Sequence, residues 1–144
     1  MHTLINRPLF IKWSTRSQTG IPLIDGQHKA IVSIINTFYY MMGKKIDNHI
    51  LYSCISDTLK SYSNIHFITE ETFLEEWQYD DIDQHKEWHR KLATEIDLIE
   101  REGIKTNDPR PLMEFLKKWW IEHINEQDMQ YAQKFADLRK GKIR

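Results

Sequence analysis

Long segments with a helical spacing of apolar residues, separated by few glycines and prolines, dominate this sequence. The chain has 144 residues, of which five are glycine and four are proline. Between residues 24 and 42, apolar side chains recur at spacings of three, four and seven, as on one face of an α-helix. A β protein of this length would need many more turn residues. The sequence therefore predicts an all-α fold.

Capping and turn residues divide the chain into four predicted helices. Pro22, Asp47 and Asp108 are typical of helix N-termini, whereas Gly43 and Gly103 are typical of helix ends. Because the connecting loops are short, consecutive helices must run antiparallel, and we expect an up-down-up-down four-helix bundle. The predicted helices cover residues 22–43, 47–77, 82–102 and 109–137.

The residues before the first predicted helix look irregular. They contain a proline at position 8 and a polar run at 14–20, so residues 1–20 are predicted to form an N-terminal arm. We expect four apolar residues of this arm to pack on the bundle: Leu9, Phe10, Ile11 and Trp13. No internal repeat or linker is evident, so a single domain over residues 1–144 is expected.

Composition and charge argue against several classes of partner. Twenty basic and 21 acidic residues are mixed along the chain, and no basic stripe suggests nucleic-acid binding. No apolar run approaches the roughly 20 residues that cross a bilayer, and the first residues do not resemble a signal peptide. Cys54 is the single cysteine, so an intrachain disulfide is impossible. We expect a cytoplasmic monomer that binds neither nucleic acid nor membranes.

Histidines and carboxylates recur at helical spacing. Residues four apart lie on the same face of a helix, so His66 and Glu70 point the same way from the second predicted helix. His85 and His89 do the same on the third. The first and fourth predicted helices add further residues of these types: His28, His123 and Asp128. In an antiparallel bundle, these faces are expected to meet in the core.

Five imidazoles and two carboxylates in one core favour a metal site. Burying unpaired polar or charged groups is costly, so a buried cluster of them needs partners. Neutral imidazole and carboxylate suit first-row metals such as iron, copper, nickel or zinc. Seven ligands exceed what one such ion accepts in common geometries. Two ions that share the carboxylates would use all seven.

The spacing of His123 and Asp128 does not fit an ideal α-helix. Five residues turn through roughly 500°, which leaves the two side chains about 140° apart. The sequence therefore predicts a π-type bulge here, or an irregular turn at His123, and π-bulges are frequent at functional sites.

With these motifs, the sequence resembles the hemerythrin family, specifically its single-domain bacterial members. The resemblance spans nearly the whole chain, and the pattern H…HxxxE…HxxxH…HxxxxD is highly specific as a set. The segments that carry it are Gly20-Ile21, Ile24-Asp25-Gly26-Gln27-His28, His66-Phe67, Glu70-Glu71, His85-x3-His89 and Trp119-x3-His123-Ile124-x3-Asp128 with Tyr131.

The resemblance implies a non-haem di-iron centre with an oxo or hydroxo bridge. Three histidines would hold one iron: His85, His89 and His123. Two histidines would hold the other: His28 and His66. Two carboxylates would bridge the irons: Glu70 and Asp128. Dioxygen would bind reversibly at the open position of the second iron and be reduced to hydroperoxide as both irons are oxidised.

An apolar pocket around the bound oxygen is expected from residues adjacent to the ligands. The predicted pocket residues are Ile31, Phe67, Trp119, Trp120, Ile124 and Gln127. Trp120 departs from the family pattern, which usually has a smaller aliphatic residue there. We expect the bulkier indole to affect oxygen affinity rather than metal binding.

The function that the resemblance implies is oxygen storage, delivery or buffering, without enzymatic activity. One alternative is a di-iron enzyme acting as a ferroxidase, as a peroxidase or on nitric oxide. Another is an oxygen or redox sensor that acts through a partner protein. Ferritin-like di-iron enzymes use Glu-x-x-His pairs, and the chain has none, which favours oxygen binding. Copper or zinc in place of iron stays open, because affinity for such sites rises toward copper.

Overall fold

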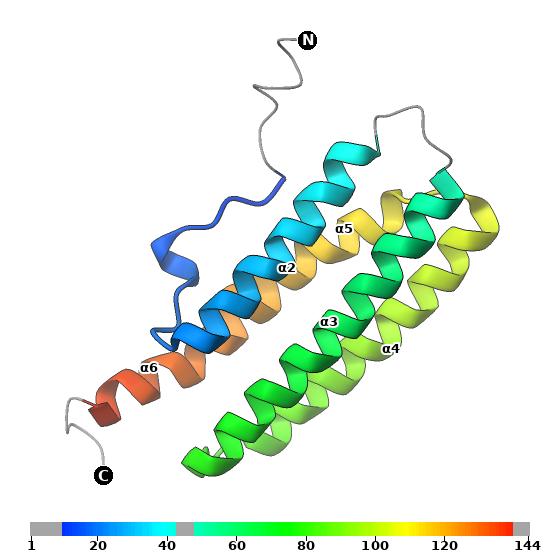
Figure 1. Ribbon diagram of the computed structural model, residues 1–144. Helices are drawn as coiled ribbons and strands as arrows, with labels where there is room; N and C mark the ends of the chain where they lie inside the picture. Colours follow the sequence, from blue (N-terminus) through cyan, green and yellow to red (C-terminus); the bar gives the residue numbers. More distant parts are fainter. Residues whose placement is uncertain (1–9, 43–47, 140–144) are drawn as a thin grey trace.

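Four antiparallel helical rods form a bundle in this computed structural model, which describes residues 10–42 and 48–139 (Figure 1). The first three rods are α2 (Pro22–Met41), α3 (Asn48–Trp77) and α4 (Ile82–Thr106). The fourth is continuous but has three parts: α5 (Arg110–Trp119), the π-helical η2 (Trp120–Gln127) and α6 (Asp128–Arg139). Each rod contacts the two rods beside it, and α5 closes the bundle against α2. The predicted all-α up-down-up-down bundle is confirmed.

The described part of the N-terminal arm lies along the bundle and contains the short 3-10 turn η1 (Thr15–Ser17). Ile11 is buried in the core, and Phe10 and Trp13 pack against it, as expected. The backbone of Ile11 is held by the Asn36 side chain, which accepts a hydrogen bond from its N–H at 2.8 Å and donates one to its carbonyl at 2.9 Å. Leu9 lies outside the described residues.

Helix α4 ends later than the sequence predicts. It runs four residues past the expected end, to Thr106, and its C-cap is Asn107 with a left-handed φ of 53°. Asparagine tolerates this backbone conformation, so glycine is not required to end the helix. Gly103 lies inside α4 instead. Two of the predicted boundary residues, Gly43 and Asp47, lie outside the described residues.

Gly103 leaves the space that Tyr52 occupies. A Cβ atom at position 103 would overlap the hydroxyl end of the Tyr52 ring. That ring is buried, and its hydroxyl donates to the Ile99 carbonyl at 3.2 Å, so it cannot move away freely. We expect Gly103→Ala to lower the free energy of unfolding by about 1–3 kcal/mol, as overpacking does.

Urea denaturation of Gly103→Ala would measure this loss. The matched control is Gly26→Ala, at a helical glycine where a Cβ atom meets nothing within 4 Å. There the better helix propensity of alanine should raise stability by up to about 1 kcal/mol. Equal gains at both positions would contradict the packing argument.

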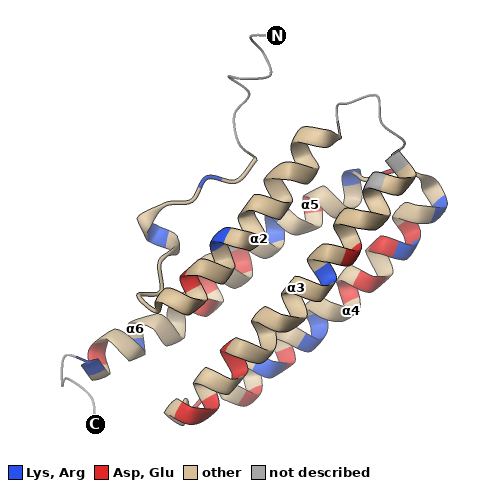
Figure 2. Cartoon of the chain, viewed as in Figure 1, with Lys and Arg blue, Asp and Glu red and all other residues tan. Residues whose placement is uncertain are grey.

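Two apolar clusters fill the bundle, one on each side of the predicted metal ligands. The larger includes Phe38, Leu59 and Leu116, and the smaller includes Leu74 and Tyr131. Acidic and basic residues alternate along α4 rather than gathering in one patch (Figure 2). None of the helices in residues 10–42 and 48–139 combines the length and the low polarity needed to cross a lipid bilayer.

Candidate metal centre

The seven side chains predicted as ligands converge from all four rods. Each is at most 3% exposed, although all seven are polar or ionisable. Their ligand atoms form two groups, within which all atoms lie within 4.8 Å of one another. The first group comprises Glu70, His85, His89, His123 and Asp128. The second comprises His28, His66, Glu70 and Asp128. The two carboxylates therefore belong to both groups, and the five histidines divide three to two.

Glu70 presents one carboxylate oxygen to each group of histidines. Its Oε1 lies 3.0 Å from Nε2 of His89 and in close contact with Nε2 of His85. Its Oε2 lies 3.3 Å from Nε2 of His66 and 3.9 Å from Nε2 of His28. A carboxylate so placed can bind one cation through each oxygen.

Asp128 repeats this arrangement on the opposite rod. Its Oδ1 lies 3.1 Å from Nε2 of His85 and 3.2 Å from Nε2 of His123. Its Oδ2 lies 3.1 Å from Nε2 of His28. Both carboxylates thus span the same two histidine groups.

The positions of the histidine nitrogens and carboxylate oxygens fit the coordination of a cation better than a set of hydrogen bonds. Nε2 of His123 and both Asp128 oxygens are buried without a hydrogen-bond partner among the described residues. Their neighbours lie 3.1–3.2 Å away, but the atoms are not aligned as donor and acceptor. In octahedral coordination with bonds of about 2.1 Å, adjacent ligand atoms lie about 3 Å apart. The spacing of these atoms is therefore that of ligands around a shared ion.

A π-helical segment brings His123 and Asp128 onto one face. Segment η2 includes His123, and the N–H of Asp128 donates to the carbonyl of His123, five residues earlier. A π-helix has more residues per turn than an α-helix, so side chains five apart point the same way. The predicted π-type bulge is confirmed. It directs the side chains of His123 and Asp128 toward the cluster.

Hydrogen bonds from outside the cluster fix the orientation of three histidine rings. In each, Nδ1 lies at hydrogen-bond distance from a side-chain oxygen while Nε2 faces the cluster. The pairs are His66 with Gln27 at 2.8 Å, His89 with Glu71 at 3.1 Å and His123 with Gln127 at 2.5 Å. An N–H at Nδ1 leaves the lone pair on Nε2 free for a metal, and such partners commonly orient metal-binding histidines.

Sequence reasoning missed part of this outer layer. Gln127 was expected as a pocket residue, but its amide oxygen contacts the outer nitrogen of His123, and its side chain is only half-buried. The spacing of four from His123 was the available signal. Nothing in the sequence pairs Gln27 with His66, because the contact joins residues 39 apart on different helices.

The cluster has strongly perturbed ionisation. Burial alone would raise the pKa of Glu70, but the nearby His66 and the hydrogen bonds from the surrounding histidines hold it well below its usual range. Burial would lower the pKa of His85, yet Asp128 and Glu70 raise it to about 10. Burial lowers the pKa of His123 to about 4. The shared carboxylates therefore stabilise positive charge on the neighbouring histidines. A bound cation can take the place of the protons that carry this charge.

Tyr131 supports Glu70 from the fourth rod. Its hydroxyl donates to Oε2 of Glu70 at 2.9 Å, and the side chain is fully buried. Burial, together with the charges of Glu70 and Asp128, raises the pKa of Tyr131 well above its usual value. Tyr131 therefore stays protonated and remains a donor.

Most of the predicted pocket residues surround the histidines with apolar surface. The Phe67 ring stacks on the His89 ring, with centroids 4.2 Å apart. Trp119 lies over His123, with centroids 6.5 Å apart, and Trp120 meets His28 edge-on at 6.2 Å. Two further predicted residues are fully buried in the same apolar cluster: Ile31 and Ile124.

Comparisons with known proteins agree with this geometry. Residues 19–135 match the model of the hemerythrin HHE cation binding domain. A bacteriohemerythrin of Pseudomonas aeruginosa is 31% identical over 124 residues, which cover 83% of this chain and 78% of that protein. A bacteriohemerythrin of Clostridium acetobutylicum is 26% identical over 124 residues, covering 83% of this chain and 96% of that protein.

The fold is similar to that of solved hemerythrin structures. A crystal structure of a hemerythrin point mutant aligns with a TM-score of 0.75 at 22% identity, and the alignment covers 88% of this chain and 97% of that one. The family model spans most of the chain and includes all seven clustered residues. The chain therefore belongs to the hemerythrin family.

Proposed function

We propose that this chain holds two iron ions and binds dioxygen reversibly, for storage, delivery or buffering. The observation that carries the proposal is the division of the cluster: two shared carboxylates lie between three histidines on one side and two on the other. The smaller group supplies one protein ligand fewer, which leaves room for a small molecule. The proposed ligands are His28, His66, Glu70, His85, His89, His123 and Asp128.

The chain's own residues would perform three tasks. The carboxylates of Glu70 and Asp128 would hold the ions together and offset their charge. The outer hydrogen bonds to Nδ1 would keep three of the imidazoles oriented, with Nε2 toward the ions. Phe67 and the neighbouring apolar side chains would exclude water and proton donors, so that bound oxygen is released rather than consumed. Two ferrous ions, when bound, would supply the electrons for reversible oxygen binding.

Two features support oxygen binding over catalysis. The relatives described above are named bacteriohemerythrins rather than enzymes. The cluster also has five imidazoles for two carboxylates, whereas ferritin-like di-iron centres are richer in carboxylates.

Anaerobic reconstitution with ferrous iron tests the proposal. We expect two irons per chain by elemental analysis and a charge-transfer absorption that appears in air and disappears under argon over repeated cycles. Failure to retain iron would overturn the metal assignment. Irreversible oxidation with turnover of peroxide or nitric oxide would show that the protein is an enzyme rather than an oxygen carrier.

A further inference from the structure

A cavity between α3 and α4 lies beside the candidate metal centre but contains none of its ligands. Its volume is about 200 Å³, which is ample for a molecule the size of dioxygen, and it is partly open to solvent. The lining residues recur at spacings of three and four, which places them on the facing sides of the two helices. They are Lys60, Ser63, Asn64 and Phe67 from α3, and Ala93, Ile96 and Asp97 from α4.

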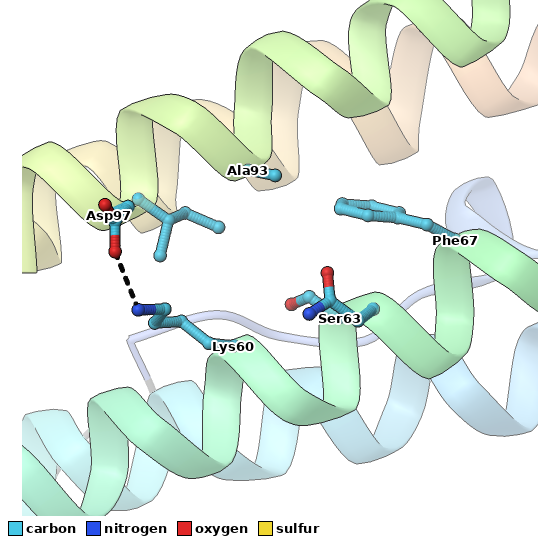
Figure 3. A pocket seen from close by; sticks show the side chains of 7 residues that line it. Lys60, Ser63, Phe67, Ala93 and Asp97 are labelled. Carbon is cyan, nitrogen blue, oxygen red and sulfur yellow. Dashed lines mark hydrogen bonds and ion pairs between the residues drawn. The ribbon is translucent and has the colours of Figure 1, made fainter.

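Small side chains keep this space open. Figure 3 shows Ser63 pointing from α3 toward the cavity and Ala93 facing it from α4. Other hydroxyls of α3 donate to the carbonyl four residues earlier, as Ser56 does at 2.7 Å and Thr69 at 2.8 Å. Ser63 is 1% exposed, yet its hydroxyl has no partner among the described residues. The Ser63 hydroxyl therefore faces open space rather than a protein acceptor.

Phe67 separates the inner end of the cavity from the metal centre. It lines the cavity and also stacks on the His89 ring, with centroids 4.2 Å apart. Its ring further meets those of His123 at 6.2 Å and His66 at 6.0 Å, so it contacts both histidine groups. A single aromatic side chain therefore stands between the cavity and the proposed oxygen pocket.

An ion pair lies at the outer end. The ammonium of Lys60 contacts Asp97 at 2.8 Å across the two helices, and it also contacts Glu100 at 3.2 Å. The Lys60 and Asp97 side chains are about one third exposed, at 32% and 34%. The pair therefore links the two helices at the end of the cavity opposite Phe67 (Figure 3).

From this arrangement we propose that the cavity is the entrance through which small neutral molecules of dioxygen size reach the metal centre. Lys60 forms the outer gate with Asp97, and Phe67 forms the inner gate. The inference rests on the proposed oxygen-binding function. It adds a route between two named helices.

Filling the cavity tests the route. Ala93→Leu extends a side chain into it, and Thr94→Leu, on the exposed side of the same turn, is the matched control. An obstructed entrance raises the barrier in both directions, so the association and dissociation rates of dioxygen should each fall about tenfold while Kd stays unchanged. Stopped-flow mixing of the iron-loaded protein measures both rates. Lys60→Met, which removes the ion pair, should raise both.

A structural readout accompanies the kinetics. Crystals of the full chain under xenon pressure should show xenon between Ser63 and Phe67, and Ala93→Leu should abolish it. Unchanged rates in Ala93→Leu, an altered Kd, or no xenon in the cavity would each overturn the route while leaving the oxygen-binding function intact. A wild-type protein that binds no dioxygen after iron loading would instead overturn the proposed function, and the route with it.

Discussion

Replacing Glu70 by glutamine is expected to remove both metal ions while the bundle stays folded. Its two carboxylate oxygens face different histidine groups, so one substitution takes an anionic ligand from each ion. An amide keeps the size of the side chain and can still accept from the Tyr131 hydroxyl. The free energy of metal binding depends on the charge that glutamine lacks. Elemental analysis should fall from two irons per chain toward none, with an unchanged helical circular dichroism spectrum.

Two neighbouring glutamates provide graded controls for this prediction. Glu76→Gln changes an exposed side chain on the same helix and should leave the metal content unchanged. Glu71→Gln alters the partner of Nδ1 of His89, outside the cluster, and should weaken metal affinity by roughly 10–100-fold without abolishing it. Retention of both ions in Glu70→Gln would show that Glu70 does not bridge them.

The fold was predictable because its determinants are local. The apolar spacing in α2 and the proline at its first turn fix where that helix begins and which face is buried. The end of α4 was not predictable in this way, because the role of Gly103 depends on Tyr52, which is 51 residues earlier in the chain. A glycine required for close packing and a glycine that ends a helix look the same in one sequence.

In the candidate site, too, the features set by local sequence were predictable and those set by contacts between helices were not. Pairs such as His66 with Glu70 were predictable, because helical periodicity alone puts them on one face. The π-helical segment was predictable from the mismatch between a spacing of five and the α-helical repeat. The bond between Gln27 and His66 and the cavity beside Phe67 were not, because both depend on how two helices are rotated against each other.

Metal loading is expected to raise the unfolding temperature by about 15–30 °C. A ligand present at 1,000 times its Kd stabilises the folded state by about 4 kcal/mol per site, so two sites contribute about 8 kcal/mol. In a domain near 150 residues, each kcal/mol corresponds to about 2–4 °C. The gain reverses on chelation, because the ligand set is assembled only in the folded bundle. Calorimetry of metal-free and loaded protein at one pH measures it.

The difference in unfolding temperature between the metal-loaded and the metal-free protein should increase as pH rises above 6.5. In the metal-free bundle, the pKa of His85 is raised to about 10, so its stabilising contribution is complete below pH 6.5 and is lost between pH 6.5 and 10. The pKa of His123 is lowered to about 4, so metal-free stability also falls as pH drops from 6.5 toward 4. The metal-free protein should therefore be most stable near pH 6.5.

Above pH 6.5, metal affinity should rise with pH while metal-free stability falls, because His85 must lose its proton before Nε2 can bind an ion. Each unit of pKa shift corresponds to about 1.4 kcal/mol, so the His85 contribution reaches about 5 kcal/mol across the full window. Thermal unfolding at pH 6.5 and 8.5, with and without metal, compares the two states directly. His85→Gln, which has no proton to lose at this position, should make the difference in unfolding temperature between loaded and metal-free protein less dependent on pH. A difference that narrows toward pH 8.5 in the wild-type protein would mean that His85 is not a metal ligand.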